Sequence, residues 1–233
     1  MKLFKLPVLK HWSYLADFIV IVLGIVVAFS LNTYWNNMQN RKVELRLLND
    51  LKEEALINLD EMIPVQNRLD SIKINGLKII NLISPQANNL SADKFYKLVS
   101  VVASFVTYDA TNAVKEAIVH NNDIDLIQNR DLQRELNILP AKLNDYVEDE
   151  LFMRNVLLYY LRPYLYKNFP IYSIQFRPTH FNISTKEVLR DKEFESYIWR
   201  MMSQAENANK EMNDYKSHIK ELIQLIDMEL ANR

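Results

Sequence analysis

The sequence predicts an all-α fold in which a single N-terminal transmembrane helix continues into an antiparallel helical bundle with long helices. Three observations favour it: an uncharged apolar stretch near the N-terminus, apolar residues that recur every three or four positions over most of the remaining chain, and only two glycines in 233 residues. Sheets need many tight turns, and tight turns use glycine heavily. A chain so poor in glycine is therefore expected to form long helices joined by few loops.

The membrane-spanning helix is predicted at residues 14–35. Residues 18–31 read FIVIVLGIVVAFSL and carry no charge. A helix from Leu15 to Thr33 rises about 28 Å, close to the roughly 30 Å of a bilayer's hydrocarbon core. Aromatic side chains favour the interface between membrane and water. They flank this stretch on both sides, as Trp12, Tyr14, Tyr34 and Trp35. We expect these four residues to anchor the helix, with membrane lipid as a partner.

A cleaved signal peptide is the alternative interpretation of this segment. Lys2, Lys5 and Lys10 would form its basic region, and residues 28–30, Ala-Phe-Ser, resemble a cleavage site. Two features oppose this alternative. Asp17 abuts the apolar stretch, and the sequence beyond the stretch runs directly into another helical pattern.

The orientation of the span follows from its short basic tail. A tail of about a dozen residues with three lysines is poorly moved across a membrane, so we expect a cytoplasmic N-terminus. The predicted organisation is a cytoplasmic tail at 1–13, the transmembrane helix at 14–35 and a helical domain at 36–233. This domain would lie in the periplasm, and the span in the inner membrane of a bacterium.

Two features inside the span could carry a function. Gly24 and Ala28 form a small-xxx-small pair, which would let a second helix approach closely, unless the pair occurs by chance. Asp17 is an acidic residue at the membrane, where a charge is costly. It would either meet a cationic partner or take a proton, or its carboxylate would simply reach the nearby headgroups.

Helices are predicted over most of residues 36–105. The spanning helix should continue from Asn36 to Met62, where Pro64 would end or kink it. A second helix follows to Ile83, with Gly76 on its apolar face. That glycine either marks close packing or costs about 1 kcal/mol relative to alanine. Ser91 is a plausible N-cap for a third helix, which would reach about residue 105.

The middle of the chain is predicted to be helical with interruptions. Thr111 would cap a short helix at 112–120, and residues 123–127 form a brief apolar piece, helical or extended. A long helix should begin near Asn129 or Arg130 and reach Lys167, with a kink at Pro140. Residues 168–183 lose the helical period and are predicted to form a loop or small hairpin.

The last helical part shows the clearest pattern. Ser184 and Glu187 form a capping box that would start it. Steps of three and four then make a heptad seam, at Ile198, Met201, Ala205, Ala208, Met212, Tyr215, Ile219, Leu222 and Ile226. This seam would be buried inside the bundle or, alternatively, form a coiled coil between chains.

The composition excludes several function classes. A net charge of −1 gives no reason to expect a nucleic acid partner. The chain has no cysteine, which excludes disulfides and thiolate chemistry. Its four histidines do not pair at metal-ligand spacing, and no phosphate-binding loop or nucleophile elbow occurs. We therefore predict no catalytic residues, no metal site and no cofactor, and a protein that is not an enzyme.

Aromatic residues are concentrated near the end of the long middle helix. They could form a contact surface for a ligand or protein, or the apolar cap of the bundle, which we favour. The candidate residues are Tyr159, Tyr160, Arg162, Tyr164, Tyr166, Phe176 and His180.

Two stretches, YLADFIVIVLGIVVAFSLNTYWNN and TYDATNAVKEAIVHNNDIDLIQNRDLQREL, resemble a domain-of-unknown-function family of bacterial single-pass membrane proteins. In that family an acidic residue opens the span, an Ile-Gly pair lies within it, and Asn and Trp close it. The matching residues are Asp17 (usually Glu), Leu23-Gly24, Asn32 and Trp35, and in the second motif Tyr108-Asp109, Thr111, Leu126-Ile127, Asn129 and Leu132. Asn121-Asn122 stands where the family has Ser-Gly. The resemblance implies the architecture but no activity.

These observations favour a membrane-anchored interaction or scaffold protein of the cell envelope. It would be a homo-oligomer or a subunit of a larger complex with another membrane protein. The alternative is a periplasmic ligand-sensing bundle that signals through a membrane partner, since the cytoplasmic tail is too short to hold an output domain.

Overall fold

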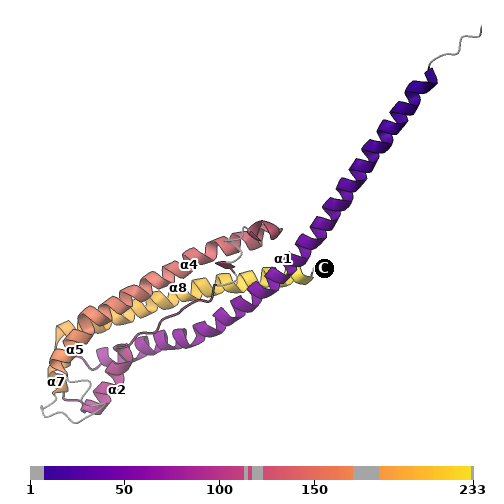
Figure 1. The fold of residues 1–233 in the computed structure, drawn as a ribbon. Coiled ribbons are helices and arrows are strands. Elements are labelled where there is room, and N and C mark those ends of the chain that lie inside the picture. The colour runs from indigo at the N-terminus through magenta and orange to yellow at the C-terminus, as the bar shows by residue number, and fades with distance from the viewer. Residues whose placement is uncertain (1–7, 113–114, 117–122, 170–183, 232–233) are drawn as a thin grey trace, which may run out of the picture.

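The computed structural model describes residues 8–112, 115–116, 123–169 and 184–231. It is 85% helical, and the described residues include no strand. Long helices lie side by side in a bundle, and one of them projects far beyond its end (Figure 1). The predicted all-α bundle is therefore confirmed.

Helix α1 (Val8–Ile80) is a single helix of 73 residues, and it joins the projecting segment to the bundle. The sequence left open whether Pro64 ends or kinks the helix, and the first alternative is wrong because α1 continues through it. Proline removes one backbone hydrogen bond, but Pro64 is exposed, so the freed carbonyl lies on the solvent side. Packing of Met62 and Val65 in the core holds the helix on both sides of the proline.

The other elements complete the bundle in chain order. They are α2 (Ala92–Val102), the 3-10 turn η1 (Asp123–Leu126), α4 (Arg130–Val156), the π-helical turn η2 (Leu157–Leu161), α5 (Arg162–Asn168), α7 (Thr185–Val188) and α8 (Lys192–Ala231). The short elements α2, α5 and α7 gather at the end away from the projecting segment (Figure 1). Helix α2 ends three residues earlier than predicted.

Helix α8 is the central partner of the bundle. It packs along both α1 and α4 and runs antiparallel to each. Polar pairs follow the α1–α8 contact in opposite chain directions: Arg41–Glu229, Lys52–Asp227, Gln66–Asn213, Asp70–Asn209 and Lys73–Glu206. All nine residues of the predicted heptad seam are buried, at most 2% exposed. The seam is therefore covered by helices of its own chain.

Close packing explains Gly76. A Cβ atom built on this residue would lie 2.3 Å from Cγ and 2.6 Å from Sδ of Met202. The glycine thus lets α1 and α8 approach each other, which confirms the packing interpretation.

Of the three N-cap residues Ser91, Asn129 and Ser184, one makes a capping hydrogen bond with its side chain. Asn129 caps α4, since its side chain accepts hydrogen bonds from the backbone N–H groups of Asp131 and Leu132. Ser91 and Ser184 occupy N-cap positions, but neither side chain makes a capping hydrogen bond. The predicted capping box therefore does not start the last helix.

Instead, the carboxylate of Asp191 accepts a hydrogen bond from the backbone N–H of Glu193 at the start of α8. The side chain next to the expected cap, Thr185, is buried and bonded to Asn89. The Thr185–Asn89 bond joins the start of α7 to the connection between α1 and α2.

The long middle helix is continuous from 130 to 168 and contains the π-helical turn just before Pro163. Pro163 has no N–H to give to the carbonyl of residue 159, and the wider turn at Leu157–Leu161 spans the point where that bond is lost. Pro140 lies inside α4 without ending it.

Candidate functional site

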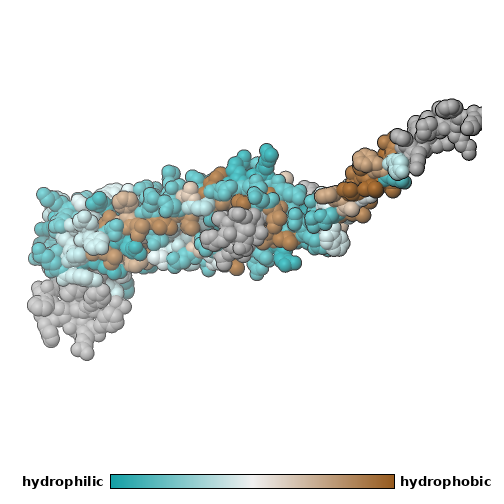
Figure 2. All heavy atoms as spheres, turned by 45° about the horizontal axis from the view of Figure 1, so that its top comes forward, coloured by the Kyte–Doolittle hydropathy of each residue, from teal (hydrophilic) through white to brown (hydrophobic). Residues whose placement is uncertain are grey.

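The projecting half of α1 is the most unusual surface of the molecule. Residues 14–40 are all exposed, and no other part of the described chain covers them. In Figure 2 the projection is largely brown, whereas the bundle is mostly teal. Among the described helices, α1 is the one long and apolar enough to cross a membrane. By length and composition, this segment could therefore span a bilayer.

The predicted span residues lie on this bare helix. Tyr14, Tyr34 and Trp35 are exposed near its two ends, and the side chain of Trp12 lies outside the described residues. The Ser30 hydroxyl donates to the carbonyl of residue 26 at 2.8 Å, so this polar group is satisfied within the helix. Asp17 is exposed on the same segment.

Gly24 and Ala28 lie one turn apart on the projection. Because they are four residues apart, they share one helix face. A Cβ atom at Gly24 would meet nothing within 4 Å. The small-residue face is therefore open within the described chain, in contrast to the packed glycine of the bundle.

An ionic cluster holds the point where α1 enters the bundle. The Arg41 guanidinium bonds the Glu44 carboxylate at 2.7 Å and the Glu229 carboxylate at 2.8 Å. The carboxylate of Glu44, which is fully buried, also accepts the backbone N–H of Gln128, and Asn129 donates to Glu229. Hydrogen bonding to Glu44 and Glu229 raises the pKa of Arg41. The start of α4 and the end of α8 are thus fastened to α1 near the projection.

The segment between α2 and α4, which we call the strap, is held to both α1 and α4 through its described residues. It comprises residues 103–129, of which 103–112, 115–116 and 123–129 are described. The side chain of Asn58 on α1 accepts from the backbone N–H of Thr111 and donates to its carbonyl, both at 2.8 Å. The Glu54 carboxylate accepts the backbone N–H of Lys115. Residues 115 and 116 are helical, and most of the short helix predicted at 112–120 lies outside the described residues.

The strap is also held from α4. The Glu150 carboxylate accepts the backbone N–H of Tyr108 at 3.3 Å. The Tyr108 ring is buried and contacts the rings of Tyr146 and Tyr215 edge-on. Burial raises the pKa of Glu150, and it raises that of Tyr215 to about 12. Side chains from α1 and α4 therefore replace the backbone partners that an extended segment lacks.

The predicted aromatic surface is partly assembled at the far end of the bundle. Tyr159 and Tyr160 are exposed, and Tyr164 is buried with its hydroxyl donating to Asp191 at 2.6 Å. Together with Tyr197 of α8 they border a hollow of about 230 Å³. Its lining also includes Pro163, Lys167, Asn168 and Glu193.

Arg162 and Tyr166, two further members of that predicted set, do not line the hollow. The guanidinium of Arg162 lies 6.0 Å from the ring of Phe105. Tyr166 is exposed and does not line the hollow, while Phe176 and His180 lie outside the described residues. The described members of the set therefore include one buried ring, Tyr164, and exposed rings at Tyr159, Tyr160 and Tyr166.

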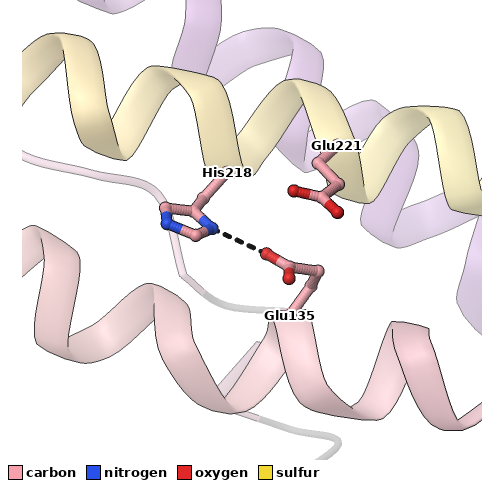
Figure 3. Close-up of side chains that lie close together, drawn as sticks. All are labelled: Glu135, His218 and Glu221. Atoms are coloured by element: carbon pink, nitrogen blue, oxygen red, sulfur yellow. Dashed lines mark hydrogen bonds and ion pairs between the residues drawn. The ribbon is translucent and has the colours of Figure 1, made fainter.

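A second cluster was not predicted. Figure 3 shows the side chain of Glu135 on α4 meeting His218 and Glu221 on α8. The His218 Nδ1 and the Glu135 Oε2 are 2.8 Å apart. One ligand atom from each of the three residues lies within 4.8 Å of the other two. This combination of side chains is chemically able to bind a metal ion.

Sequence reasoning missed this cluster because its two halves are 83 residues apart. The spacing of three between His218 and Glu221 was visible and puts both on one helix face. That spacing is common on charged helices, however, and the partner from α4 is apparent only once the helices are packed.

Comparison with known proteins adds no further information. No family model matches the chain, and neither a curated protein nor a solved structure matches it. Function is therefore inferred from the chain's own geometry.

Proposed function

We propose that the chain is a single-pass protein of a bacterial inner membrane, with its N-terminus in the cytoplasm and its helical domain in the periplasm. It acts there as an interaction or scaffold protein, self-associating or serving as a subunit of a larger membrane complex. The single-pass family that the sequence resembles would have this architecture.

The observation that carries this proposal is the unbroken course of α1. The same helix has a segment bare on all sides at 14–40 and a segment buried in the bundle from Glu44 onward. A helix without a hinge transmits the position and rotation of its membrane half to its other half. The Arg41 cluster further fixes α4 and α8 to this helix at the junction.

Native electrophoresis and cross-linking of the protein, extracted from its own membrane in mild detergent, test the proposal. Gly24→Leu should weaken an assembly that packs on the small-residue face. The matched control is Val22→Leu, because residue 22 lies about 200° around the helix from residue 24. A monomer without any co-purifying partner would contradict the proposal, and equal effects of both variants would contradict the role of this face.

The hollow at the far end favours a second candidate function, a ligand-sensing bundle that signals through a membrane partner. Ligand sites usually measure about 300–1,000 Å³, so this hollow of about 230 Å³ suits a small molecule. Its rim offers aromatic faces together with the charges of Lys167 and Glu193. A metabolite panel read by thermal shift tests this candidate: a stabilising compound should lose its effect in Tyr159→Ala. No stabilising compound, or one that acts equally on the variant, argues against sensing at this site.

A further inference from the structure

The cluster of Glu135, His218 and Glu221 has the composition of a metal site. His218 and Glu221 lie three residues apart on α8 and therefore project from one face. Glu135 meets them from the second turn of α4, near the end of the bundle from which α1 projects. The three side chains thus converge from α4 and α8, which pack directly against each other.

Charge and burial at this point favour a bound cation. Glu135 is only 3% exposed, and its sequence neighbour Leu136 is part of the apolar core. A buried carboxylate is costly unless it is paired. Within the described chain the recorded partner of the Glu135 carboxylate is His218, while Glu221 brings a second carboxylate within 4.8 Å. Two carboxylates thus lie close together beside one imidazole nitrogen, and a divalent cation between them would offset their mutual repulsion.

We propose that Glu135, His218 and Glu221 bind a divalent transition metal ion, with Zn²⁺ as the best match. Imidazole nitrogen suits Zn²⁺, Cu²⁺ and related ions, whereas Ca²⁺ takes about six to eight oxygen ligands and Mg²⁺ retains several waters. Three protein ligands leave a fourth tetrahedral position. Because Glu221 is exposed, this position faces solvent and is open to water.

The site needs only small movements to accept the ion. Ligand atoms about 2.0–2.2 Å from Zn²⁺ are about 3.4 Å apart in a tetrahedron. The Nδ1–Oε2 pair, now 2.8 Å apart, must open slightly, and the exposed Glu221 side chain must swing inward. The ion then takes the place of the hydrogen between Nδ1 and Oε2. The ring binds the ion through Nδ1 and keeps one hydrogen, on Nε2, and a second ring proton, where present, passes to solvent.

The bound ion would clamp α4 to α8 beside the junction with the projecting helix. This role goes beyond scaffolding, because it makes the packing at that end of the bundle depend on metal. It does not depend on which partner the span binds, so the two proposals can fail separately.

Titration with Zn²⁺ tests the site. The full chain, without a polyhistidine tag, is purified in detergent, stripped with a chelator and titrated in competition with a chromophoric chelator. We expect one ion per chain. Loss of an outer-shell partner alone weakens metal sites about 10–100-fold, so Glu221→Gln, which removes a direct ligand, should raise the Kd by at least about tenfold. Glu195→Gln is the matched control, since it is the same change on α8, about 39 Å away along the helix.

A spectroscopic measurement identifies the ligand independently of affinity. Cu²⁺ bound to the full chain should show electron paramagnetic resonance coupling to the nitrogen of one imidazole. His218→Gln should remove this coupling while circular dichroism shows that the helices persist. Glu221 is exposed, so Glu221→Gln should fold normally. The Zn²⁺ titration of this variant therefore still tests the site if His218→Gln unfolds.

Three outcomes would overturn the proposal. One is the absence of saturable Zn²⁺ binding. Another is binding that Glu221→Gln leaves unchanged, which would place the ion elsewhere. The third is an equal loss in Glu195→Gln, which would indicate a general effect of charge.

Discussion

The two halves of α1 have the same backbone but opposite surroundings. Residues 14–37 are apolar on nearly every side and wholly exposed, whereas residues 44–79 are apolar mainly on one face, which is buried. Ile21 is 61% exposed and Ile72 is 0% exposed. One neighbouring helix can cover an apolar stripe, whereas a helix that is apolar on most sides is suited to lipid around it. The comparison shows that the pattern of side chains, rather than helix formation, separates the two environments.

The largest expected effect comes from truncating one isoleucine in each half. Ile72→Ala should lower the free energy of unfolding of the bundle by about 2–5 kcal/mol, because it leaves a cavity in the core. Ile21→Ala should change it by less than about 0.5 kcal/mol. Denaturant unfolding of the full chain in detergent, followed by circular dichroism, measures both. Equal losses would show that the projecting half also packs against the bundle.

The strap provides the next test of the buried half. Asn58→Leu removes both hydrogen bonds to the Thr111 backbone and should lower the free energy of unfolding by about 2 kcal/mol or more. Asn49→Leu is its control on the same helix, because Asn49 is exposed and bonds only a carbonyl of its own helix among the recorded partners. The same unfolding experiment applies. If both variants lose equally, the strap contact is not what stabilises the fold.

The two glycines, Gly76 in the buried half of α1 and Gly24 in the projecting half, allow a test with a smaller expected effect. Gly76→Ala should destabilise the bundle by about 1–2 kcal/mol, since the new methyl group collides with Met202. In a Met202→Ala background the sign should reverse, because alanine is about 1 kcal/mol better than glycine in a helix. Gly24→Ala should leave bundle unfolding unchanged. A Gly76→Ala effect that persists in the Met202→Ala background would contradict the collision.

The smallest effect is expected at the surface of the bundle. The Lys73 ammonium and the Glu206 carboxylate are 2.6 Å apart, and the two side chains are 41% and 62% exposed. Lys73→Ala should therefore cost at most about 0.5 kcal/mol. Chemical unfolding by urea at low and high salt should show this small difference shrinking with salt. A loss several times larger would show that the α1–α8 contact depends on this ion pair.

Local sequence signals predicted the helices well where packing agreed with them. The start of the long middle helix near Asn129 and the heptad seam were readable because each depends on residues close in sequence. The helix end expected at Pro64 is absent, because packing around the proline outweighs one lost hydrogen bond. The capping box expected at Ser184 is absent too, and the neighbouring Thr185 side chain bonds Asn89. Local preferences of about 1 kcal/mol are readily overridden by burial.

The candidate sites also differ in whether they depend on residues close in sequence or on distant residues. The apolar length of residues 14–35 follows from the sequence alone, since hydrocarbon thickness and helix rise are fixed quantities. The meeting of Glu135 with His218, and of Asn58 with Thr111, was decided only by the tertiary structure. Periodicity in a sequence shows which face of a helix is apolar, but not which distant face covers it. Which faces pack together depends on the fit of side chains across the whole chain.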